Sequence, residues 1–496
     1  MSKAGYIPKD QRKTILFLAD DMRMPSGIGT MTRELILGTA HIFNYVHVGA
    51  GINHPDIGKI FDLSHDINKE LGIDDASVLL YPYNGYGDPG LVRDLIRNHK
   101  VDAIMHFTDP RYWVWLYQMS AEIRQHIPIF YYHIWDDLPA PHYNKPFYES
   151  CDLLMGISKQ SVNISHLVLG EGNYTELTNQ TTAEEIQQAL PKTCYIPHGI
   201  NHNIFKKLEV SPELSLFKSR LFKGEDVTFS ILYNNRNIRR KMTSDIILAF
   251  KLFVDKLAPE HKTKVRLVMH TQPIDENGTN LLAVIETLCP EVADQIIFTN
   301  ARYNSEDMCK LYNSCDVTIN IGSNEGWGLS STESIMCGTP IINNVTGGLQ
   351  DQCRFEDENG EWIKFTPDFA TNHAGRYKKH GKWVKPVYPA AINLQGSIPT
   401  PYIFDDRADI RDVAKAMMAW YETSPEERVE CGLAGREWAC SEEAGFTAER
   451  MCDSYTKACN KVLDNYVAPK RFKVYNIQTE IQKYKTRKTG IVLSYE

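Results

Sequence analysis

Short apolar runs alternate with segments whose apolar positions recur every three to four residues along the N-terminal part of the chain. The runs predict buried strands, and the periodic segments predict helices that cover both faces of a parallel sheet. We expect strands at Ile15–Ala19, Tyr45–Val48, Ala76–Leu80, Asp102–Phe107, Ile127–His133, Leu153–Ile157 and Cys194–Ile196, and helices at Gly29–Ala40, Gly90–Asn98, Trp113–Arg124 and Lys159–Leu169. This pattern is typical of a Rossmann-like unit that ends near Phe205.

The alternation resumes after Pro212–Asp226, which has the composition of a polar, mixed-charge connection. A second unit begins at Val227–Tyr233, with further strands expected at Val265–His270, Gln295–Thr299, Val317–Ile321 and Pro340–Asn343, and helices at Thr243–Leu257 and Asp307–Ser314. Helical periodicity returns from Asp409, and we expect helix starts at Ser424 and Ser441. A long closing helix is predicted by Phe446, Met451, Tyr455, Ala458, Val462 and Tyr466, which follow the helical period.

Two such units in tandem predict two α/β domains, at residues 1–210 and 211–445. Ligands of open parallel sheets bind beyond the carboxyl ends of the strands. In a two-domain chain this rule places the chemistry in the cleft between the domains.

Composition narrows the setting of this chemistry. With 43% hydrophobic and 23% charged residues, the chain is ordinary for a globular protein, and no apolar run is long enough to span a bilayer. Met1–Asp10 has no apolar signal core, and the eleven cysteines lack a framework spacing, so we expect a cytoplasmic protein with reduced thiols. The net charge of −8 argues against a surface that is basic all over, although local basic patches remain open.

The most informative stretch is Gly322–Pro340, in which seven residues separate the carboxylates of Glu325 and Glu333. Between them lies Gly326-Trp-Gly-Leu-Ser330, whose glycines let backbone amides approach a bound group. We expect Ser330 or Ser331 to cap a short helix, with Glu333 in its first turn. A helix N-terminus binds anions, so this loop suits a phosphate held on amides while the carboxylates face hydroxyls.

This stretch closely resembles the E-x7-E signature of the family-four retaining glycosyltransferases of the GT-B fold (glycosyl transferases group 1). The resemblance implies two Rossmann-like domains facing across a cleft, with residues 446–496 forming a closing helix and basic tail that return to the N-terminal domain. It implies that Glu325 contacts the donor sugar and that Glu333 hydrogen-bonds the nucleotide ribose. The loop formed by Gly326, Trp327, Gly328, Leu329 and Ser330 would then meet the diphosphate.

Arg236 and Lys241 follow the strand Val227–Tyr233, five residues apart, and can clamp a diphosphate as its charge develops. The resembling family has Gly-Arg and Lys-Gly at this place, whereas here Asn235 and Met242 replace the two glycines. The roles of leaving-group stabilisers carry over to Arg236 and Lys241 on that resemblance. The alternative is a solvated basic run that includes Arg239 and Arg240.

Other candidates stand at strand ends of the N-terminal unit. Gly27 and Gly29 open the first helix where the family's glycine loop approaches the donor phosphate or the acceptor, and His133 matches a histidine that contacts the donor sugar. On the acceptor side we expect Asp20, His106, Arg111 and Tyr112. For His133 the alternative is a structural histidine, and for the glycines it is an ordinary strand–helix turn.

The chain departs from the family at residues 352–400, where many extra residues replace a short turn. Within them, Arg376 and Trp383 belong to a basic and aromatic run that suits phosphate contacts with base or sugar stacking. The tail from Lys470 to Lys488 has a similar character. We interpret both as an acceptor surface, for a glycan or for a modified base in DNA as in a viral-type member of this fold class; the alternative is a solvated hairpin that closes the domain.

The resulting hypothesis is a metal-independent retaining transferase, hexosyl or pentosyl, that uses a nucleoside-diphosphate sugar as co-substrate and no other cofactor. Glu325, His133, Arg236 and Lys241 are its predicted catalytic residues. No convincing metal-binding Asp-x-Asp loop is present, so Arg and Lys would neutralise the leaving group. Two alternatives stay open, a nucleotide-sugar epimerase of the same fold and a non-catalytic nucleotide-sugar-binding scaffold. The sequence leaves the sugar, the nucleotide, the acceptor and the oligomeric state undetermined.

Overall fold

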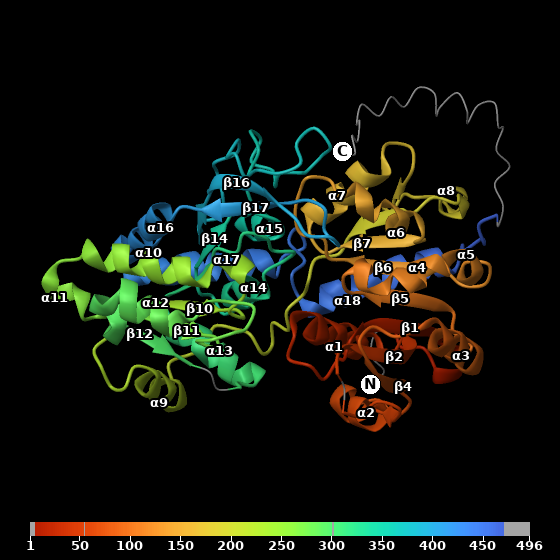
Figure 1. The fold of residues 1–496 in the computed structure, drawn as a ribbon. Coiled ribbons are helices and arrows are strands. Elements are labelled where there is room, and N and C mark those ends of the chain that lie inside the picture. The colour runs from red at the N-terminus through yellow and green to blue at the C-terminus, as the bar shows by residue number, and fades with distance from the viewer. Residues whose placement is uncertain (1–4, 54, 300–301, 471–496) are drawn as a thin grey trace, which may run out of the picture.

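The computed structural model describes residues 5–53, 55–299 and 302–470 of the chain. Figure 1 shows two α/β domains side by side, with α18 (Ala448–Leu463) running along the N-terminal domain near α1. Within the described residues, no helix combines the length and the apolar character needed to cross a membrane.

The N-terminal domain is built on a sheet with the strand order β3-β4-β2-β1-β5-β6-β7-β9-β8, in which β3 alone runs antiparallel to its neighbour within the described residues. Its strands are β1 (Lys13–Asp20), β2 (Phe43–Ile52), β3 (Phe61–Asp62), β4 (Val78–Asn84), β5 (Ala103–Phe107), β6 (Ile129–His133), β7 (Leu153–Gly156), β8 (Thr175–Glu176) and β9 (Lys192–Tyr195). Successive side chains of a strand point to opposite faces, so Ile15 and Phe17 enter one core while Leu16 and Leu18 enter another. The seven strands expected in this domain are all present.

Helices cover both faces of this sheet, as the alternating pattern predicted. They are α1 (Gly27–Thr39), α2 (Ser64–Leu71), α3 (Pro89–His99), α4 (Val114–Gln118), α5 (Ser120–Ile123), α6 (Lys145–Glu149), α7 (Lys159–Leu169) and α8 (Ala183–Gln187). The prediction of one helix at Trp113–Arg124 is wrong, because the segment is divided between a 3-10 turn at Pro110–Trp113, α4 and α5. Trp113 leaves the helical region (φ −115°, ψ 28°) at the point where its indole is fully buried.

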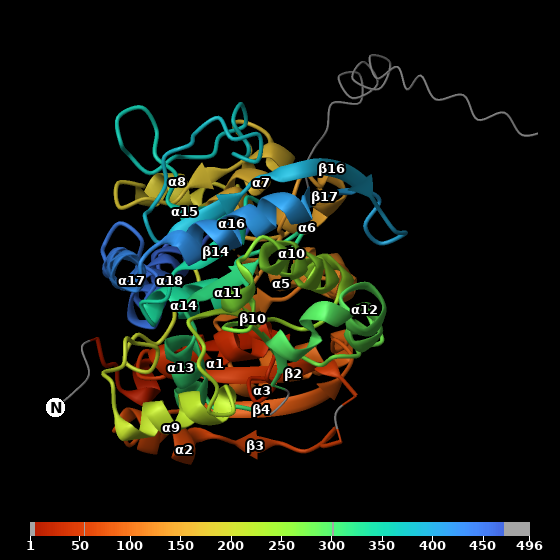
Figure 2. The same ribbon diagram turned by 90° about the vertical axis from the view of Figure 1, so that its left-hand side faces the viewer.

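The C-terminal domain contains a parallel sheet with the order β12-β11-β10-β13-β14-β15. The strands are β10 (Phe229–Asn234), β11 (Val265–His270), β12 (Ile296–Phe298), β13 (Val317–Asn320), β14 (Ile341–Asn344) and β15 (Val384–Val387). Its helices are α9 (Pro212–Leu221), α10 (Thr243–Asp255), α11 (Pro259–Lys262), α12 (Leu281–Leu288), α13 (Ser305–Ser314), α14 (Leu329–Met336), α15 (Leu349–Cys353), α16 (Ile410–Glu422) and α17 (Pro425–Ala439). Figure 2 shows the strands between α10 and α12 on one side and α14 and α17 on the other.

Two local predictions in this half are corrected. The expected connection at Pro212–Asp226 contains α9, which begins with Ser211 as a side-chain cap and Pro212 in its first turn. The expected helix start at Ser441 is wrong, since α18 begins at Ala448 with Thr447 as its cap. The insertion at 352–400 supplies β15 and then β16 (Pro389–Gln395), which pairs antiparallel with β17 (Ile403–Ala408).

The closing helix α18 returns to the N-terminal domain and packs against α1. The Cys452 Sγ approaches the Glu34 carbonyl at 3.6 Å, and the rings of Phe43 and Tyr455 meet edge to face at 6.3 Å. A side chain at Gly38 would collide with Cys452, because a Cβ placed there would lie 2.2 Å from its Sγ. Residues 471–496, which hold most of the predicted basic tail, lie outside the described residues.

A pair of buried carboxyl groups lies where the two domains meet. Asp137, just beyond β6, accepts hydrogen bonds at Oδ2 from Asn324 Nδ2 (3.2 Å) and Thr346 Oγ1 (3.3 Å). Asp406, on β17, is fully buried beside Asp137, with which it shares a hydrogen bond when Asp137 is protonated, and His373 Nδ1 lies 3.7 Å from its Oδ1. Burial and the neighbouring Asp406 raise the pKa of Asp137 well above its usual range. Folding therefore favours the protonated form of Asp137 at pH values above the ordinary aspartate range.

We expect Asp406→Asn to stabilise the protein at neutral pH by about 1–3 kcal/mol, because the neutral amide removes the repulsion between the two carboxylates and can donate a hydrogen bond to Asp137. Because the pKa of Asp137 is raised on folding, stability falls as pH rises above the ordinary aspartate range. The increase in Tm of Asp406→Asn over the wild-type protein should therefore be larger at pH 7.5 than at pH 4.5. Asp405→Asn is the matched control, because Asp405 already accepts a hydrogen bond from Ser323 Oγ (3.3 Å). Equal shifts for the two variants would contradict this account.

Candidate active site

Glu325 forms the centre of a buried ion cluster at the carboxyl end of the C-terminal sheet. It lies in the loop after β13, and Lys241 and Arg240 lie in a 3-10 turn (Arg239–Lys241) after the neighbouring strand β10. Lys241 Nζ donates to Glu325 Oε1 at 2.7 Å and Oε2 at 2.5 Å, and Arg240 Nη1 donates to Oε2 at 2.7 Å. Two cations thus share one carboxylate, and the Asp136 carboxyl group lies close enough to Arg240 to help raise its pKa.

The environment sets the charge states of this cluster. Burial by itself would raise the pKa of Glu325, but Lys241 and Arg240 outweigh it and hold the pKa below its ordinary value. Burial lowers the pKa of Lys241 to about 8, with Glu325 acting in the opposite direction. At neutral pH both groups are ionised.

Arg236 lies apart from this cluster. Its side chain is 60% exposed, and its guanidinium pairs with Asp275 through Nε–Oδ2 at 2.7 Å and Nη2–Oδ1 at 3.1 Å. Arg240, which the sequence placed in a solvated basic run, holds the position beside Glu325 instead. In this conformation the predicted Arg236–Lys241 clamp is therefore replaced by an Arg240–Lys241 pair.

The glycine loop after Glu325 packs tightly against both domains. A Cβ at Gly326 would lie 3.0 Å from the Ile134 carbonyl, and Gly328 has a left-handed backbone (φ +88°) with Leu349 2.4 Å from an added Cβ. Trp327, predicted to face the donor, instead points into the core, where its ring meets His198 at 6.2 Å and Phe446 at 4.8 Å. The indole anchors the loop, and Gln352 Nε2 holds its backbone by donating to the Trp327 carbonyl at 2.6 Å and the Gly328 carbonyl at 3.2 Å.

Helix α14 begins at Leu329, two or three residues earlier than a cap at Ser330 or Ser331 would place it. Ser331 is buried and donates to Asn343 Oδ1 at 2.8 Å, while Ser330 Oγ accepts from Asn235 Nδ2 at 3.3 Å. Glu333 accordingly lies in the second turn. Its carboxylate is half-buried and reaches towards the end of β10.

A hydrogen-bond chain leads from β10 to Glu333. Asn234 Nδ2 donates to the Tyr312 hydroxyl at 2.7 Å, and that hydroxyl donates to Glu333 Oε2 at 2.7 Å. Burial raises the pKa of Glu333 to about 7, although the Tyr312 hydrogen bond opposes the shift. A carboxyl group with a pKa near 7 is easily ionised, and both oxygens of the ionised form accept hydrogen bonds. Hydroxyl groups of a ligand that donate to these oxygens therefore favour loss of the proton.

The N-terminal domain presents a second helix N-terminus to this loop. Ser26 caps α1 by accepting from the Gly29 amide at 2.9 Å, and its hydroxyl donates to Asp20 Oδ2 at 2.9 Å. A Cβ at Gly27 would lie 3.4 Å from Leu329 Cδ1, so the first turns of α1 and α14 face each other across the cleft. Two helix N-termini and a cationic cluster converge there, an arrangement suited to a diphosphate.

Both predicted histidines are buried and closed off from the cleft. His133 Nε2 hydrogen-bonds the Tyr148 hydroxyl at 2.5 Å, and His106 lies between the Tyr117 hydroxyl (2.7 Å) and Thr108 Oγ1 (3.0 Å). Burial lowers the pKa of each to about 3, so both rings are neutral. The predictions of sugar contact by His133 and acceptor contact by His106 are not supported by this conformation, because both side chains are fully enclosed.

Of the two acceptor residues predicted in the insertion, one is buried and one is exposed. Trp383 is wrong as an acceptor residue, since its ring stacks on Trp438 at 4.8 Å and its Nε1 donates to the Gln352 carbonyl at 3.0 Å in the core. Arg376 is exposed, with its guanidinium over the Phe369 ring at 5.3 Å, on the surface of the insertion.

Three further acceptor candidates lie at the carboxyl edge of the N-terminal sheet. Tyr112 is 57% exposed and stacks on Tyr86 at 4.6 Å. Burial raises the pKa of Asp20, whose carboxylate accepts from Ser26. Arg111 pairs with Asp109 and borders a cavity that extends to the ion cluster.

That cavity, of about 430 Å³, lies between the domains. It is lined by groups from both domains and from the β16–β17 segment: Asp109, Arg111, Ile134, Trp135, Asp136, Arg240, Asn324, Gln395, Gly396, Ser397, Thr400 and Ile403. Because Arg240 belongs both to this lining and to the Glu325 cluster, the cavity opens directly onto the cluster.

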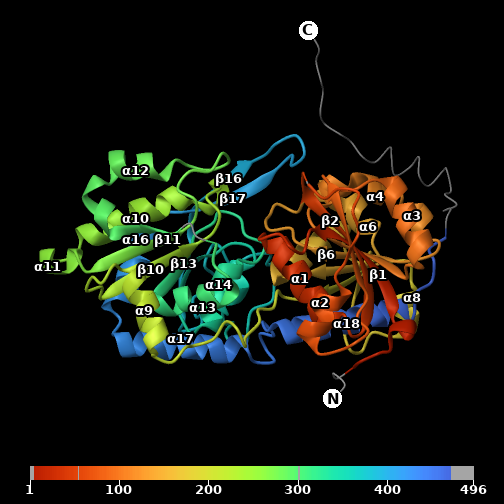
Figure 3. The same cartoon turned by 90° about the horizontal axis from the view of Figure 1, so that it is seen from below.

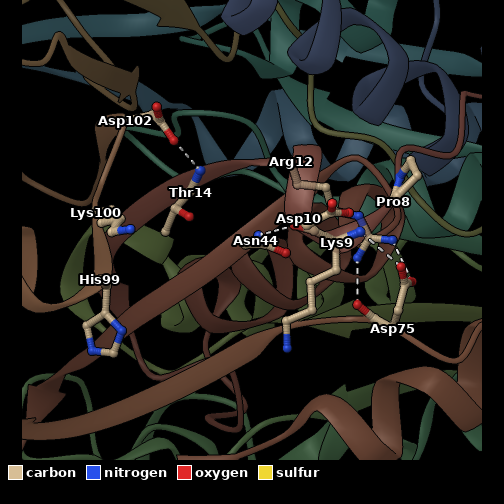
Figure 4. Close-up of a pocket in the computed structure, with 10 residues that line it drawn as sticks. All are labelled: Pro8, Lys9, Asp10, Arg12, Thr14, Asn44, Asp75, His99, Lys100 and Asp102. Carbon is tan, nitrogen blue, oxygen red and sulfur yellow. Dashed lines mark hydrogen bonds and ion pairs between the residues drawn. The ribbon is translucent and has the colours of Figure 1, made fainter.

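A larger hollow, of about 660 Å³, lies at the opposite end of the N-terminal sheet (Figure 4). Its lining comes from the amino ends of β1, β2 and β5. Arg12 turns towards Asp75 there, with Nη2–Oδ1 at 2.6 Å, and the Thr14 amide donates to Asp102 at 2.8 Å. These charges are already paired, and the hollow lies away from the carboxyl strand ends, so we do not assign the chemistry to it.

No cluster of three or more histidine, cysteine or acidic side chains placed to hold a metal ion occurs among the described residues. Comparison with known proteins gives a family match in the domain that contains the Glu325 cluster. The family model "Glycosyl transferases group 1" matches residues 217–373, a stretch that includes Arg240, Lys241, Glu325 and Glu333. A search of curated proteins gives no match.

Solved structures with a similar fold span nearly the whole chain. Sucrose-phosphate synthase from Thermosynechococcus elongatus matches with a TM-score of 0.61 and 14% identity, over 91% of this chain and 100% of that one. A glycosyltransferase from Rickettsia africae has values of 0.59 and 13%, covering 92% and 100%, and HepE from Anabaena in complex with UDP-glucose has 0.59 and 14%, covering 90% and 99%. The chain therefore has the GT-B fold, as the resemblance implied, and the group 1 glycosyltransferase model matches part of its C-terminal domain.

We expect Lys241→Met to destabilise the fold by about 3 kcal/mol, near the low end for a broken buried ion pair because Arg240 still contacts Glu325. The double variant Lys241→Met with Glu325→Gln should be less destabilised than the two single effects added together, because neither member of the Lys241–Glu325 pair is then left charged without the other. Urea unfolding of the four proteins measures the coupling. Additive effects would show that the pair is not energetically linked.

Proposed function

We propose that this protein is a retaining glycosyltransferase that moves a sugar from a nucleoside-diphosphate sugar to an acceptor hydroxyl. The observation that carries the proposal is the buried cluster in which Lys241 and Arg240 share the Glu325 carboxylate, placed beside the N-termini of α1 and α14. The family match over the C-terminal domain supports the donor assignment.

In this proposal the diphosphate lies against the first turns of the two helices, near Gly27 and Leu329. Lys241 and Arg240 stabilise the negative charge that develops as the sugar–phosphate bond breaks. They supply positive charge of the kind that a metal ion supplies in other phosphate-transferring sites, so metal independence is part of the proposal. Glu333 accepts hydrogen bonds from the ribose hydroxyls.

The acceptor hydroxyl attacks the face that the diphosphate leaves, and the departing phosphate oxygen takes the hydroxyl proton. Retention of configuration follows from attack on the same face. Glu325 is held ionised by its two cations, which suits it to face the positive charge of an oxocarbenium-like sugar. No separate enzyme base is required in this scheme, and the neutral, enclosed His133 has no role in it beyond packing.

The cavity beside Arg240 favours transfer over the epimerase alternative. It extends from Arg240 and Asn324 to Asp109 and Arg111 of the other domain, which leaves room for a second substrate. An epimerase would need acid and base groups around one sugar and no acceptor space.

Thermal-shift titration with UDP-, GDP- and ADP-sugars tests the proposal first. UDP-glucose is the leading probe because it is the ligand in the HepE complex with a similar fold. We expect at least one donor to raise Tm, and Lys241→Ala to abolish the shift. The absence of a shift with any donor for the well-folded wild-type protein would favour the scaffold alternative.

Removal of the leaving-group cations should separate their roles. We expect Lys241→Ala and Arg240→Ala each to lower donor turnover by at least ~10-fold, as for other groups that stabilise developing charge. Arg236→Ala should have a smaller effect, since Arg236 is exposed and paired with Asp275. Initial rates of donor hydrolysis measure the effect of each of the three variants. A larger loss of turnover in Arg236→Ala than in Arg240→Ala would assign stabilisation of the leaving group to Arg236.

Donor affinity should depend on the protonation of Glu333. Because its pKa is raised to about 7 and ribose hydroxyls bind the carboxylate, donor binding must release a proton below that pH. Affinity should therefore rise with pH up to about 7, by at most ~10-fold per unit, and then level off. Isothermal titration between pH 5.5 and 8 measures this profile. Glu333→Gln should flatten it, and an unchanged profile in that variant would assign the proton elsewhere.

A further inference from the structure

The hairpin formed by β16 and β17 is an addition that reaches across the cleft. Its strands pair from Gln395–Ile403 to Pro389–Ala408, and its turn spans residues 396–402. Figure 3 shows it projecting from the C-terminal domain towards the N-terminal domain. The hairpin lies beyond residues 217–373, the stretch matched by the family model.

Hydrogen bonds fasten the hairpin to the N-terminal domain. The Phe404 amide donates to the Leu138 carbonyl at 2.7 Å, and the Tyr143 hydroxyl donates to the Tyr402 carbonyl at 2.8 Å. Nearer the turn, Arg111 Nη1 donates to the Pro399 carbonyl at 3.1 Å. The turn is thus held over the carboxyl edge of the N-terminal sheet.

The base of the hairpin is joined to the donor loop as well. The Asp406 amide donates to the Ser323 carbonyl at 3.0 Å, and Asn324 Nδ2 donates to the Phe404 carbonyl at 2.5 Å. Asn324 precedes Glu325 in the chain. The hairpin is therefore fixed with respect to both substrate-facing domains.

The hairpin turn closes one side of the cavity next to Arg240. Gln395, Ser397 and Thr400 supply an amide and two hydroxyl groups to its lining, and Asn324 adds another amide. Across from them lie Asp136, which is half-buried, and the Asp109–Arg111 pair. The lining holds two carboxylates and two guanidinium groups, and Arg240 already contacts Glu325, so the cavity carries no cationic excess.

We propose that the β16–β17 turn completes the acceptor site and selects a neutral carbohydrate, an inference that rests on the transferase function proposed above. Sugar hydroxyls both donate and accept hydrogen bonds, which matches a lining of amides, hydroxyls and carboxylates. Asp136 accepts from one of these hydroxyls beside Arg240. The hairpin residues Gln395 and Thr400 determine which carbohydrate fits.

The same lining disfavours the polyanionic acceptor considered from the sequence. Nucleic-acid affinity comes largely from cationic side chains that neutralise phosphates, whereas here the two carboxylates offset the two guanidinium groups. The face of Trp135 is covered by Arg111, whose guanidinium lies 4.9 Å from the ring centre. The site therefore recognises its ligand by hydrogen bonds and not by stacking on that indole.

Binding measurements on the full chain in the presence of UDP test this inference. The probes are a panel of neutral mono- and disaccharides, the corresponding sugar phosphates, and a DNA duplex, each titrated by saturation-transfer NMR. We expect a neutral saccharide to bind the wild-type protein and to bind the Gln395→Ala/Thr400→Ala variant at least ~10-fold more weakly, since two hydrogen bonds are lost. Both side chains lie at the surface of the hairpin, so the variant should fold, and its Tm checks this.

Ile398→Ser is the matched control, because Ile398 lies in the same turn, is 98% exposed and does not line the cavity. It should bind saccharides as the wild type does. The inference is overturned if no neutral saccharide binds, if sugar phosphates or DNA bind more tightly, or if the double variant binds as well as the control. UDP-sugar thermal shifts, recorded on the same samples, report on the donor site, so a failure of the transferase proposal would appear there and not in the saccharide arm.

Discussion

A carboxylate buried in a protein interior must be paired with positive charge, and the pairing of Glu325 organises much of this molecule. Lys241 and Arg240 come from the turn after β10, and Glu325 comes from the loop after the adjacent strand β13. Their contact therefore ties two neighbouring strand ends together and fixes the loop that leads into α14. Because two cations meet one carboxylate, an anion that arrives from the cleft finds two positively charged side chains already held in place.

The loop that carries Glu325 also joins the two domains, and close backbone approach is what makes this possible. Gly347 has a left-handed backbone (φ +45°), and a Cβ there would lie 2.0 Å from the Glu325 carbonyl and 2.9 Å from that of Asp136. The three segments can meet at this distance only without a side chain at that position. The donor loop, the end of β6 and the loop after β14 consequently form one packed junction, and the hairpin adds a second connection above it.

Much of the fold could be predicted from the sequence because its strands are continuous apolar runs buried on both faces. The turn chemistry was harder to predict. Ser441 resembles a helix cap, but Thr447 caps α18, and α9 has little apolar periodicity, with Leu221 its one buried residue. Such boundaries depend on which of several acceptable caps the tertiary packing favours.

In the candidate site as well, some residues could be predicted from the sequence and others could not. Glu325, Lys241 and Glu333 were predictable because their motif fixes a local geometry, and the assignment of their roles stays a prediction. Arg240 was missed because the two glycines of the resembling family are replaced. Met242 nevertheless keeps a left-handed backbone (φ 53°), the conformation a glycine adopts readily, and the 3-10 turn before it orients Arg240 towards Glu325. The enclosure of His133, His106 and Trp383 comes from contacts between distant segments, for which a single sequence carries no local signal.

The return of α18 to the N-terminal domain has a consequence for biosynthesis. The surface of α1 around Gly38 is completed by Cys452, and Phe43 is covered by Tyr455, residues that leave the ribosome only after the entire second domain. Domains generally fold in order as they emerge during synthesis. In this protein the apolar face of the first domain stays uncovered until the second domain and α18 have been synthesised. During that stage, binding of a chaperone to the exposed face competes with the packing of α18 onto it.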